Sequence, residues 1–158
     1  MDLKDKIRSI ENYPQKGVIF RDITTLLKDA EAMKTAVDEI TARLAEVQYD
    51  LVLSPESRGF IFGMPVAYNM GKGFVPVRKA GKLPAETISK EYELEYGTAT
   101  IEIHKDAVRQ GQRVVIVDDL LATGGTAKAI MEMVEEMGAE VAACAFLIEL
   151  DFLEGRKD

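Results

Sequence analysis

The chain has 158 residues, 47% of them hydrophobic, which is enough to bury the core of one domain, so we expect residues 1–158 to form a single domain. The net charge of −7 disfavours a general nucleic-acid-binding surface but leaves room for a local anion site. No apolar run approaches the roughly 18 residues of a membrane span, and the charged residues 1–10 differ from a signal peptide. We therefore expect a cytoplasmic protein with no nucleic-acid or membrane partner.

Short apolar runs rich in β-branched residues alternate along the chain with helical patterns. Helices are predicted at about residues 30–48, 59–70 and 125–137, and strands at residues 50–54, 74–78, 114–118 and 140–150. The run at 114–118 is apolar on both faces, which is typical of a parallel sheet covered on both sides. The predicted fold class is therefore α/β, with a central, mainly parallel sheet flanked by helices.

Residues 79–98 interrupt this alternation, because they mix glycine, proline and charge. Their composition predicts a long loop, and such loops within a compact domain are more often functional than structural. Cys144 lies in an apolar run, which predicts a buried, inert thiol in a reducing compartment. His104 has no second histidine with which to share a metal ion, so we expect no metal site built by the protein alone.

Two adjacent acids, Asp118 and Asp119, end the predicted strand at 114–118, and a glycine-rich turn follows at residues 122–126. Ligands of open α/β sheets bind at the carboxyl ends of the strands. For a phosphate, the turn supplies backbone N–H groups, threonine hydroxyls and the positive end of a helix. Its glycines have no Cβ, so the ligand can approach the backbone closely. The acids would repel a phosphate, so they suit ribose hydroxyls or a hydrated Mg²⁺. This pattern predicts a sugar-phosphate site, with a turn carrying two solvated acids as the alternative.

The segment VVIVDDLLATGGT at residues 114–126 resembles the phosphoribosyl-pyrophosphate (PRPP) signature of type I phosphoribosyltransferases. Further segments resemble adenine phosphoribosyltransferases in order and spacing, namely residues 13–27, 55–63, 74–84 and 91–108. The resemblance as a whole runs from about residue 7 to 156. The resemblance implies the type I phosphoribosyltransferase fold, with a flexible hood loop at about residues 79–98. It also implies a glycosyltransferase of purine salvage that converts adenine and PRPP to AMP and pyrophosphate.

Two other functions stay open. A phosphoribosyltransferase for hypoxanthine, guanine or xanthine would share the phosphate-binding residues. A non-catalytic regulator of the same fold would sense PRPP or bind RNA, although the acidic balance counts against RNA.

The resemblance also implies roles for individual residues. The 5′-phosphate would be bound by Ala122, Thr123, Gly124, Gly125 and Thr126, and the ribose hydroxyls by Asp118 and Asp119. Pyrophosphate would be bound by Glu56, Ser57, Arg58, Arg78, Lys79 and Lys82. The base would be bound by Val18, Ile19, Phe20 and Arg21. Simpler alternatives are a helix cap at Glu56 and Ser57, a solvated basic loop at 78–82 and an ordinary strand at 18–21.

Glu95 matches the acid of the family's hood and is the candidate general acid/base, the alternative being one more exposed charge. The resemblance further implies Mg²⁺ bound with the substrate pyrophosphate, and a homodimer. Ser54 stands where glycine is expected, so a positive φ at that position would be strained. Family members run on by a terminal strand, so the C-terminal strand is expected to be shortened here.

Overall fold

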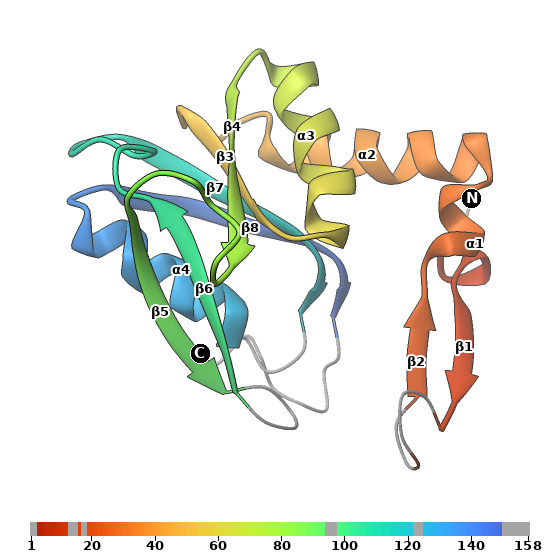
Figure 1. Cartoon of the computed structure of the whole chain (residues 1–158). Coiled ribbons are helices and arrows are strands. Elements are labelled where there is room, and N and C mark those ends of the chain that lie inside the picture. The colour runs from red at the N-terminus through yellow and green to blue at the C-terminus, as the bar shows by residue number, and fades with distance from the viewer. Residues whose placement is uncertain (1–2, 13–15, 17–18, 94–97, 122–124, 150–158) are drawn as a thin grey trace. The chain divides into compact units, whose positions relative to one another are not determined.

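The computed structural model describes residues 3–12, 16, 19–93, 98–121 and 125–149 of the chain (Figure 1). The chain groups into two compact units, Met1–Glu39 and Ile40–Asp158. A single domain over residues 1–158 therefore stays a prediction. Within the described residues, no helix is both long enough and apolar enough to cross a lipid bilayer.

The first unit consists of short elements and the first part of a longer helix. They are η1 (Leu3–Lys6), β1 (Arg8–Glu11), β2 (Ile19–Asp22), α1 (Thr24–Leu27) and α2 (Ala30–Leu44), which continues into the second unit. Strands β1 and β2 pair antiparallel. The Asp22 carboxylate accepts hydrogen bonds from the backbone N–H and hydroxyl of Thr24 and from the Arg8 guanidinium, which lower its pKa to about 2. These bonds fix the end of β2 against the start of α1.

The second unit is built on a six-stranded sheet. Its elements are β3 (Leu51–Pro55), α3 (Arg58–Met70), β4 (Gly73–Lys79), β5 (Thr87–Glu93), β6 (Thr98–His104), β7 (Arg113–Leu121), α4 (Gly125–Glu136) and β8 (Glu140–Glu149). The strand order is β5-β6-β4-β3-β7-β8. The pairs among β4, β3, β7 and β8 are parallel, whereas β6 pairs antiparallel with both β4 and β5. The α/β class and the mainly parallel sheet are confirmed.

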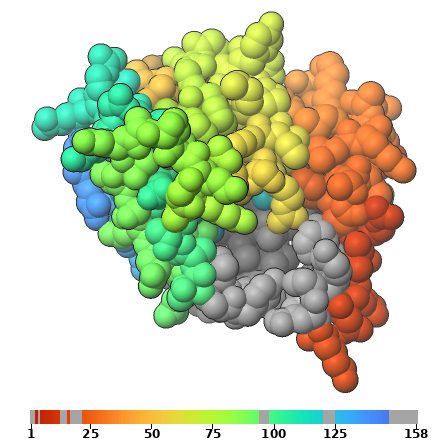
Figure 2. All heavy atoms as spheres, viewed as in Figure 1, coloured from red at the N-terminus to blue at the C-terminus, as the bar shows by residue number. Residues whose placement is uncertain are grey.

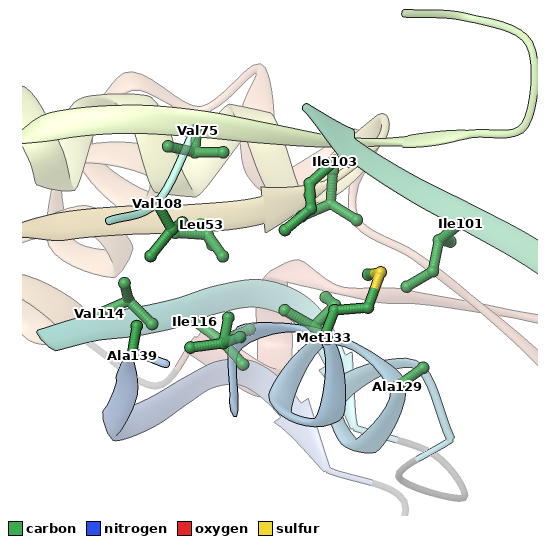
Figure 3. Packing of buried hydrophobic residues seen from close by; sticks show 13 residues of the cluster. Leu53, Val75, Ile101, Ile103, Val108, Val114, Ile116, Ala129, Met133 and Ala139 are labelled. Atoms are coloured by element: carbon green, nitrogen blue, oxygen red, sulfur yellow. The ribbon is translucent and has the colours of Figure 1, made fainter. Parts of the chain in front are cut away.

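The core of this unit lies between the sheet and α4. Leu53 and Ile116 of the sheet and Met133 of α4 point into one buried cluster (Figure 3). Val115 and Val117 alternate with Ile116 and are also fully buried, because α3 covers the other face of the sheet (Figure 1). The continuous apolar run at 114–117 therefore reflects a strand with a helix on each face, as predicted.

The chain around the start of β8 shows two local features. Gly138 follows α4 with φ of 82°, a left-handed conformation that suits glycine, and caps the C-terminal end of that helix. Cys144 was expected to be buried, but it lies exposed on β8 and that prediction is wrong. Strand β8 is the last strand of the sheet, so its apolar sequence does not imply burial of every side chain. The surrounding atoms still desolvate the Cys144 thiol and raise its pKa, which keeps it protonated and unreactive.

The region predicted as a loop at 79–98 contains a strand. Residues Thr87–Glu93 form β5, which pairs antiparallel with β6 along its whole length. Ile88, Lys90 and Tyr92 are half-buried while the residues between them are exposed, so β5 has the period of two typical of a strand with one covered face. Charged residues at the exposed positions hid this period, because the whole segment reads as polar.

Candidate functional site

The two acids that end the run at 114–117 lie within β7, at the carboxyl end of its pairing with β3. The Asp119 side chain is almost fully buried, and its backbone N–H donates a 2.7 Å hydrogen bond to Oδ1 of Asp118. Burial raises the pKa of Asp118 to about 8, and the neighbouring Asp119 carboxyl adds to the shift. Asp118 therefore keeps its proton at neutral pH. Asp119 beside it lies close to a cation.

That cation is Arg58, the first residue of α3. Its Nε lies 2.9 Å from Oδ2 of Asp119, in an ion pair whose geometry falls short of a well-aligned hydrogen bond. The Asp119 side chain is 5% exposed and the Arg58 side chain 37% exposed, so the pair connects the interior to the surface. A residue assigned to ribose and a residue assigned to pyrophosphate are thus in direct contact.

Helix α3 begins against these acids because its second residue is glycine. A Cβ at Gly59 would lie 2.9 Å from Oδ1 of Asp118 and 3.0 Å from Cδ of Pro55, closer than real Cβ contacts permit. Ser57 occupies the N-cap position, but its side chain makes no capping hydrogen bond, so capping does not account for this side chain. The peptide bond between Glu56 and Ser57 is cis.

Glu56 holds the end of β4. Its Oε1 accepts a 2.8 Å hydrogen bond from Nε of Arg78 and a 2.7 Å bond from the backbone N–H of Lys79. Partial burial opposes ionisation of Glu56, but the Lys79 N–H and the Arg78 guanidinium outweigh it, and the pKa is lowered. This carboxylate positions the two basic residues that the sequence assigns to pyrophosphate.

Ser54 lies at the same edge of the sheet without the strain that a positive φ would cause. Among the described residues, Asn12 alone has a positive φ without being glycine. Ser54 is completely buried in β3, and its Oγ has no hydrogen-bond partner within the described part of the chain. The room for this hydroxyl comes from Gly63 of α3, where a Cβ would overlap Ser54 Oγ. Serine in place of the expected glycine is thus accommodated by a glycine on the facing helix.

The segment between β4 and β5 is attached to β6 through an acid that the sequence analysis missed. Oε1 of Glu102 accepts a 2.9 Å hydrogen bond from the backbone N–H of Gly81, and its Oε2 accepts one from the hydroxyl of Thr87. Lys82 follows this attachment and is exposed. Figure 2 shows this stretch in light green on the surface that faces the viewer. The alternation in TATIEIH at 98–104 was the available signal for a strand carrying Glu102.

Other predicted site residues lie partly or wholly outside the described residues. Gly125 and Thr126 begin α4 and are half-buried. The backbone of Ile19, Phe20 and Arg21 lies in β2 of the first unit. Outside the described residues are Glu95, Val18, Ala122, Thr123 and Gly124. The contacts that can be followed therefore join the acids of β7, the start of α3 and the end of β4.

Comparison with known proteins gives a consistent result. Residues 24–158 match the family model of the phosphoribosyl transferase domain. A protein of Agathobacter rectalis named adenine phosphoribosyltransferase is 59% identical over 155 residues, which cover 98% of this chain and 89% of that protein. The crystal structure of adenine phosphoribosyltransferase from Thermoanaerobacter pseudethanolicus has a TM-score of 0.95 at 58% identity, covering 98% of this chain and 90% of that one.

A more distant structure carries ligands. The adenine phosphoribosyltransferase of Saccharomyces cerevisiae, complexed with adenine and an imino-altritol bisphosphate, has a TM-score of 0.90 at 42% identity. It covers 98% of this chain and 90% of the yeast chain.

Proposed function

The chain belongs to the adenine phosphoribosyltransferases, which form AMP and pyrophosphate from adenine and PRPP in purine salvage, and we propose that its reaction is carried out at the carboxyl ends of β3, β4 and β7. The observation that carries this placement is the contact of Arg58 with Asp119 beside Asp118. It brings residues suited to an anion and residues suited to sugar hydroxyls to one edge of the sheet.

Asp118 and Asp119 bind the ribose hydroxyls in this proposal. Carboxylate oxygens accept hydrogen bonds that hydroxyls donate. As pyrophosphate leaves, the sugar gains positive charge, and an ionised Asp119 in a buried position stabilises that charge more than a solvated acid would. The tight placement of Asp118 against Gly59 supports a fixed position for both acids.

Pyrophosphate binds to the cationic groups along the same edge. Arg58, Arg78, Lys79 and Lys82 supply charge, and the backbone at Ser57 and at the start of α3 supplies N–H donors. Glu56 acts on this ligand through Arg78 and Lys79, which it holds in place. A carboxylate that faced the pyrophosphate directly would repel it, so we assign Glu56 a positioning role.

The remaining roles rest on the family resemblance. Ala122 to Thr126 bind the 5′-phosphate, supported by the helix that begins at Gly125. Val18 to Arg21 bind adenine, and Glu95 exchanges a proton with the purine ring. In the second unit, β5 ends at Glu93, two residues before Glu95.

The substrate pyrophosphate would bring Mg²⁺ into the site. This ion prefers carboxylate, phosphate and water oxygens, and the Asp118 carboxyl in β7 would fit such a set once it has lost the proton that its raised pKa retains. Bound there, the ion would neutralise charge on the leaving pyrophosphate.

A homodimer is also proposed, through the outer face of α3. Met64 and Tyr68 are one turn apart on this helix and are 53% and 84% exposed, although both are large and apolar or aromatic. Arg58 begins the same helix, so a partner on this face would lie near the site. A cytoplasmic location is supported by the single cysteine in 158 residues.

Substrate choice tests the proposal directly. The protein is mixed with PRPP and Mg²⁺ and with adenine, hypoxanthine, guanine or xanthine in separate reactions, and the nucleotide is identified by chromatography. AMP should form fastest by a wide margin. Preferred formation of a 6-oxopurine nucleotide would show instead a phosphoribosyltransferase for hypoxanthine, guanine or xanthine. If no nucleotide forms with any of the four bases, a non-catalytic regulator would be supported.

A further inference from the structure

The ion pair between Arg58 and Asp119 joins two parts of the substrate site that have different ligands. In the proposed function Asp119 binds ribose hydroxyls and Arg58 binds pyrophosphate. In the structure Nε of Arg58 lies 2.9 Å from Oδ2 of Asp119. Each side chain therefore engages the charged group with which the other would bind its own ligand. A substrate that uses both residues must rearrange the pair.

We propose that the Arg58–Asp119 ion pair makes the enzyme select pyrophosphate that is joined to a ribose over free pyrophosphate. The inference rests on the proposed roles of these two residues. A ribose that reaches Asp119 donates hydrogen bonds to its carboxylate, and these hydrogen bonds replace the ion pair with Arg58. Arg58 is then released toward the pyrophosphate group of the same molecule.

The burial of the two side chains gives this exchange its direction. Asp119 is 5% exposed, and an ionised carboxylate at such a position needs a cation or hydrogen-bond donors beside it. Arg58 is 37% exposed and begins a helix, so its guanidinium can turn toward solvent while the backbone stays in place. Free pyrophosphate offers Asp119 no donor, and drawing Arg58 away would leave the buried carboxylate without its cation, with only the neighbouring Asp118 carboxyl beside it.

The neighbouring acid provides a matched comparison. Asp118 adjoins Asp119 and accepts a hydrogen bond from its backbone N–H, whereas the carboxylate 2.9 Å from Nε of Arg58 is that of Asp119. Asp118→Asn and Asp119→Asn are the same chemical change at adjacent positions of one strand. Asp119→Asn removes the carboxylate that pairs with Nε of Arg58, whereas Asp118→Asn leaves it in place.

The test is titration calorimetry of the unliganded protein with inorganic pyrophosphate at fixed Mg²⁺ and pH 7. Asp119→Asn should bind pyrophosphate about fivefold more tightly than the wild type, even though its turnover of PRPP falls. Asp118→Asn should bring no gain in pyrophosphate affinity, because the ion pair between Arg58 and Asp119 stays in place. In an Arg58→Gln background, Asp119→Asn should bring no gain, because the released cation is absent.

A second measurement needs no substitution. Ribose 5-phosphate added to the wild-type protein should tighten pyrophosphate binding, and pyrophosphate should tighten ribose 5-phosphate binding by the same factor. This measurement decides the matter if Asp119→Asn fails to fold.

The possible outcomes separate this inference from the proposed function. If Asp119→Asn loses turnover but binds pyrophosphate no more tightly, Asp119 keeps its ribose role and the selection by the ion pair is overturned. A gain that persists with Arg58→Gln also overturns it, because general loss of negative charge would then be the cause. If Asp119→Asn changes neither turnover nor pyrophosphate affinity, the proposed ribose role itself fails.

Discussion

The carboxyl ends of β3 and β7 and the hairpin formed by β5 and β6 belong to one sheet, but they are held together in opposite ways. At the first, buried acids lie against glycines, and Gly59 and Gly63 leave no room for even one added carbon. At the second, the edge strand β5 is only half-covered. Ile88 and Tyr92 pack partly buried against the core, and Lys90 pairs with Glu132 and Glu136 of α4 between half-exposed side chains. A closely packed side chain has little room to move, whereas an exposed ion pair adds little to the stability of a strand. The comparison indicates that the acids require fixed geometry and that the hairpin tolerates change.

The largest expected effect would sharpen this comparison, because the residue concerned, Glu95, follows β5 by two residues in the sequence. Glu95→Gln keeps shape and hydrogen bonding but removes the group proposed to exchange a proton with the purine. General acid–base catalysis is worth about 10²- to 10⁴-fold, so the chemical step should slow by that factor while the affinity for PRPP stays nearly constant. Single-turnover kinetics measures this step without interference from slow product release.

Matched controls for Glu95 lie close to it in the sequence. Glu91 and Glu93 are exposed on β5, and their replacement by Gln should leave the chemical step unchanged. A slowing of less than about threefold with Glu95→Gln would remove this residue from the proposed mechanism.

Gly63→Ala tests the close packing at the other region. The new Cβ would overlap Ser54 Oγ and lie 2.9 Å from Cε1 of Phe74, so the free energy of unfolding should fall by about 1–3 kcal/mol. In a Ser54→Gly background the same substitution should cost clearly less, because only the contact with Phe74 remains and alanine favours a helix over glycine. Urea unfolding of the four proteins measures both values. Equal effects in the two backgrounds would show that Ser54 and Gly63 are not packed as described.

Asp118 should make stability depend on pH. Folding raises its pKa from 3.8 to about 8, so the folded state favours the protonated form. The corresponding stability is complete below the lower value and is lost as the pH rises through about 8. Asp118→Asn should therefore be nearly equal to wild type at pH 4 and more stable than wild type by about 1 kcal/mol or more at pH 8, allowing for strong screening. Urea unfolding at several pH values checks this, and a difference that does not grow with pH would contradict it.

The smallest effect is expected from the ion pairs of the hairpin. Lys90→Met keeps the length of the side chain but removes its contacts with Glu132 and Glu136, at 3.2 and 2.8 Å. The melting temperature should fall by less than about 3 °C, and the difference should vanish in high salt, since exposed pairs are weak and screened. Lys105→Met is the control, because Lys105 lies 3.8 Å from the exposed Glu86 and should matter less still. A larger loss that persists in salt would show that the hairpin is as firmly packed as the central strands.

Local patterns in the sequence were sufficient for the central elements. The strands at 51–55, 73–79, 113–121 and 140–149 and the helices at 58–70 and 125–136 lie within a few residues of their predicted bounds. Burial on two faces makes a strand continuously apolar, and burial on one face gives a helix its period, so each signal is contained in a short window. The apolar run likewise placed Asp118 and Asp119 near the carboxyl end of a strand, although β7 continues to Leu121, so that the acids lie within it.

The tertiary structure alone decided which side chains meet. Strand β5 was missed because its pairing with β6 and its cover by α4 involve residues distant in sequence. The same holds for the ion pair of Arg58 with Asp119, for the hold of Glu56 on Arg78, and for the fit of Ser54 against Gly63. A pattern along the chain records which face of an element is buried, but not what covers that face or which charge lies opposite. Those contacts depend on the order and crossing of strands, and they turn a recognisable motif into a site with defined partners.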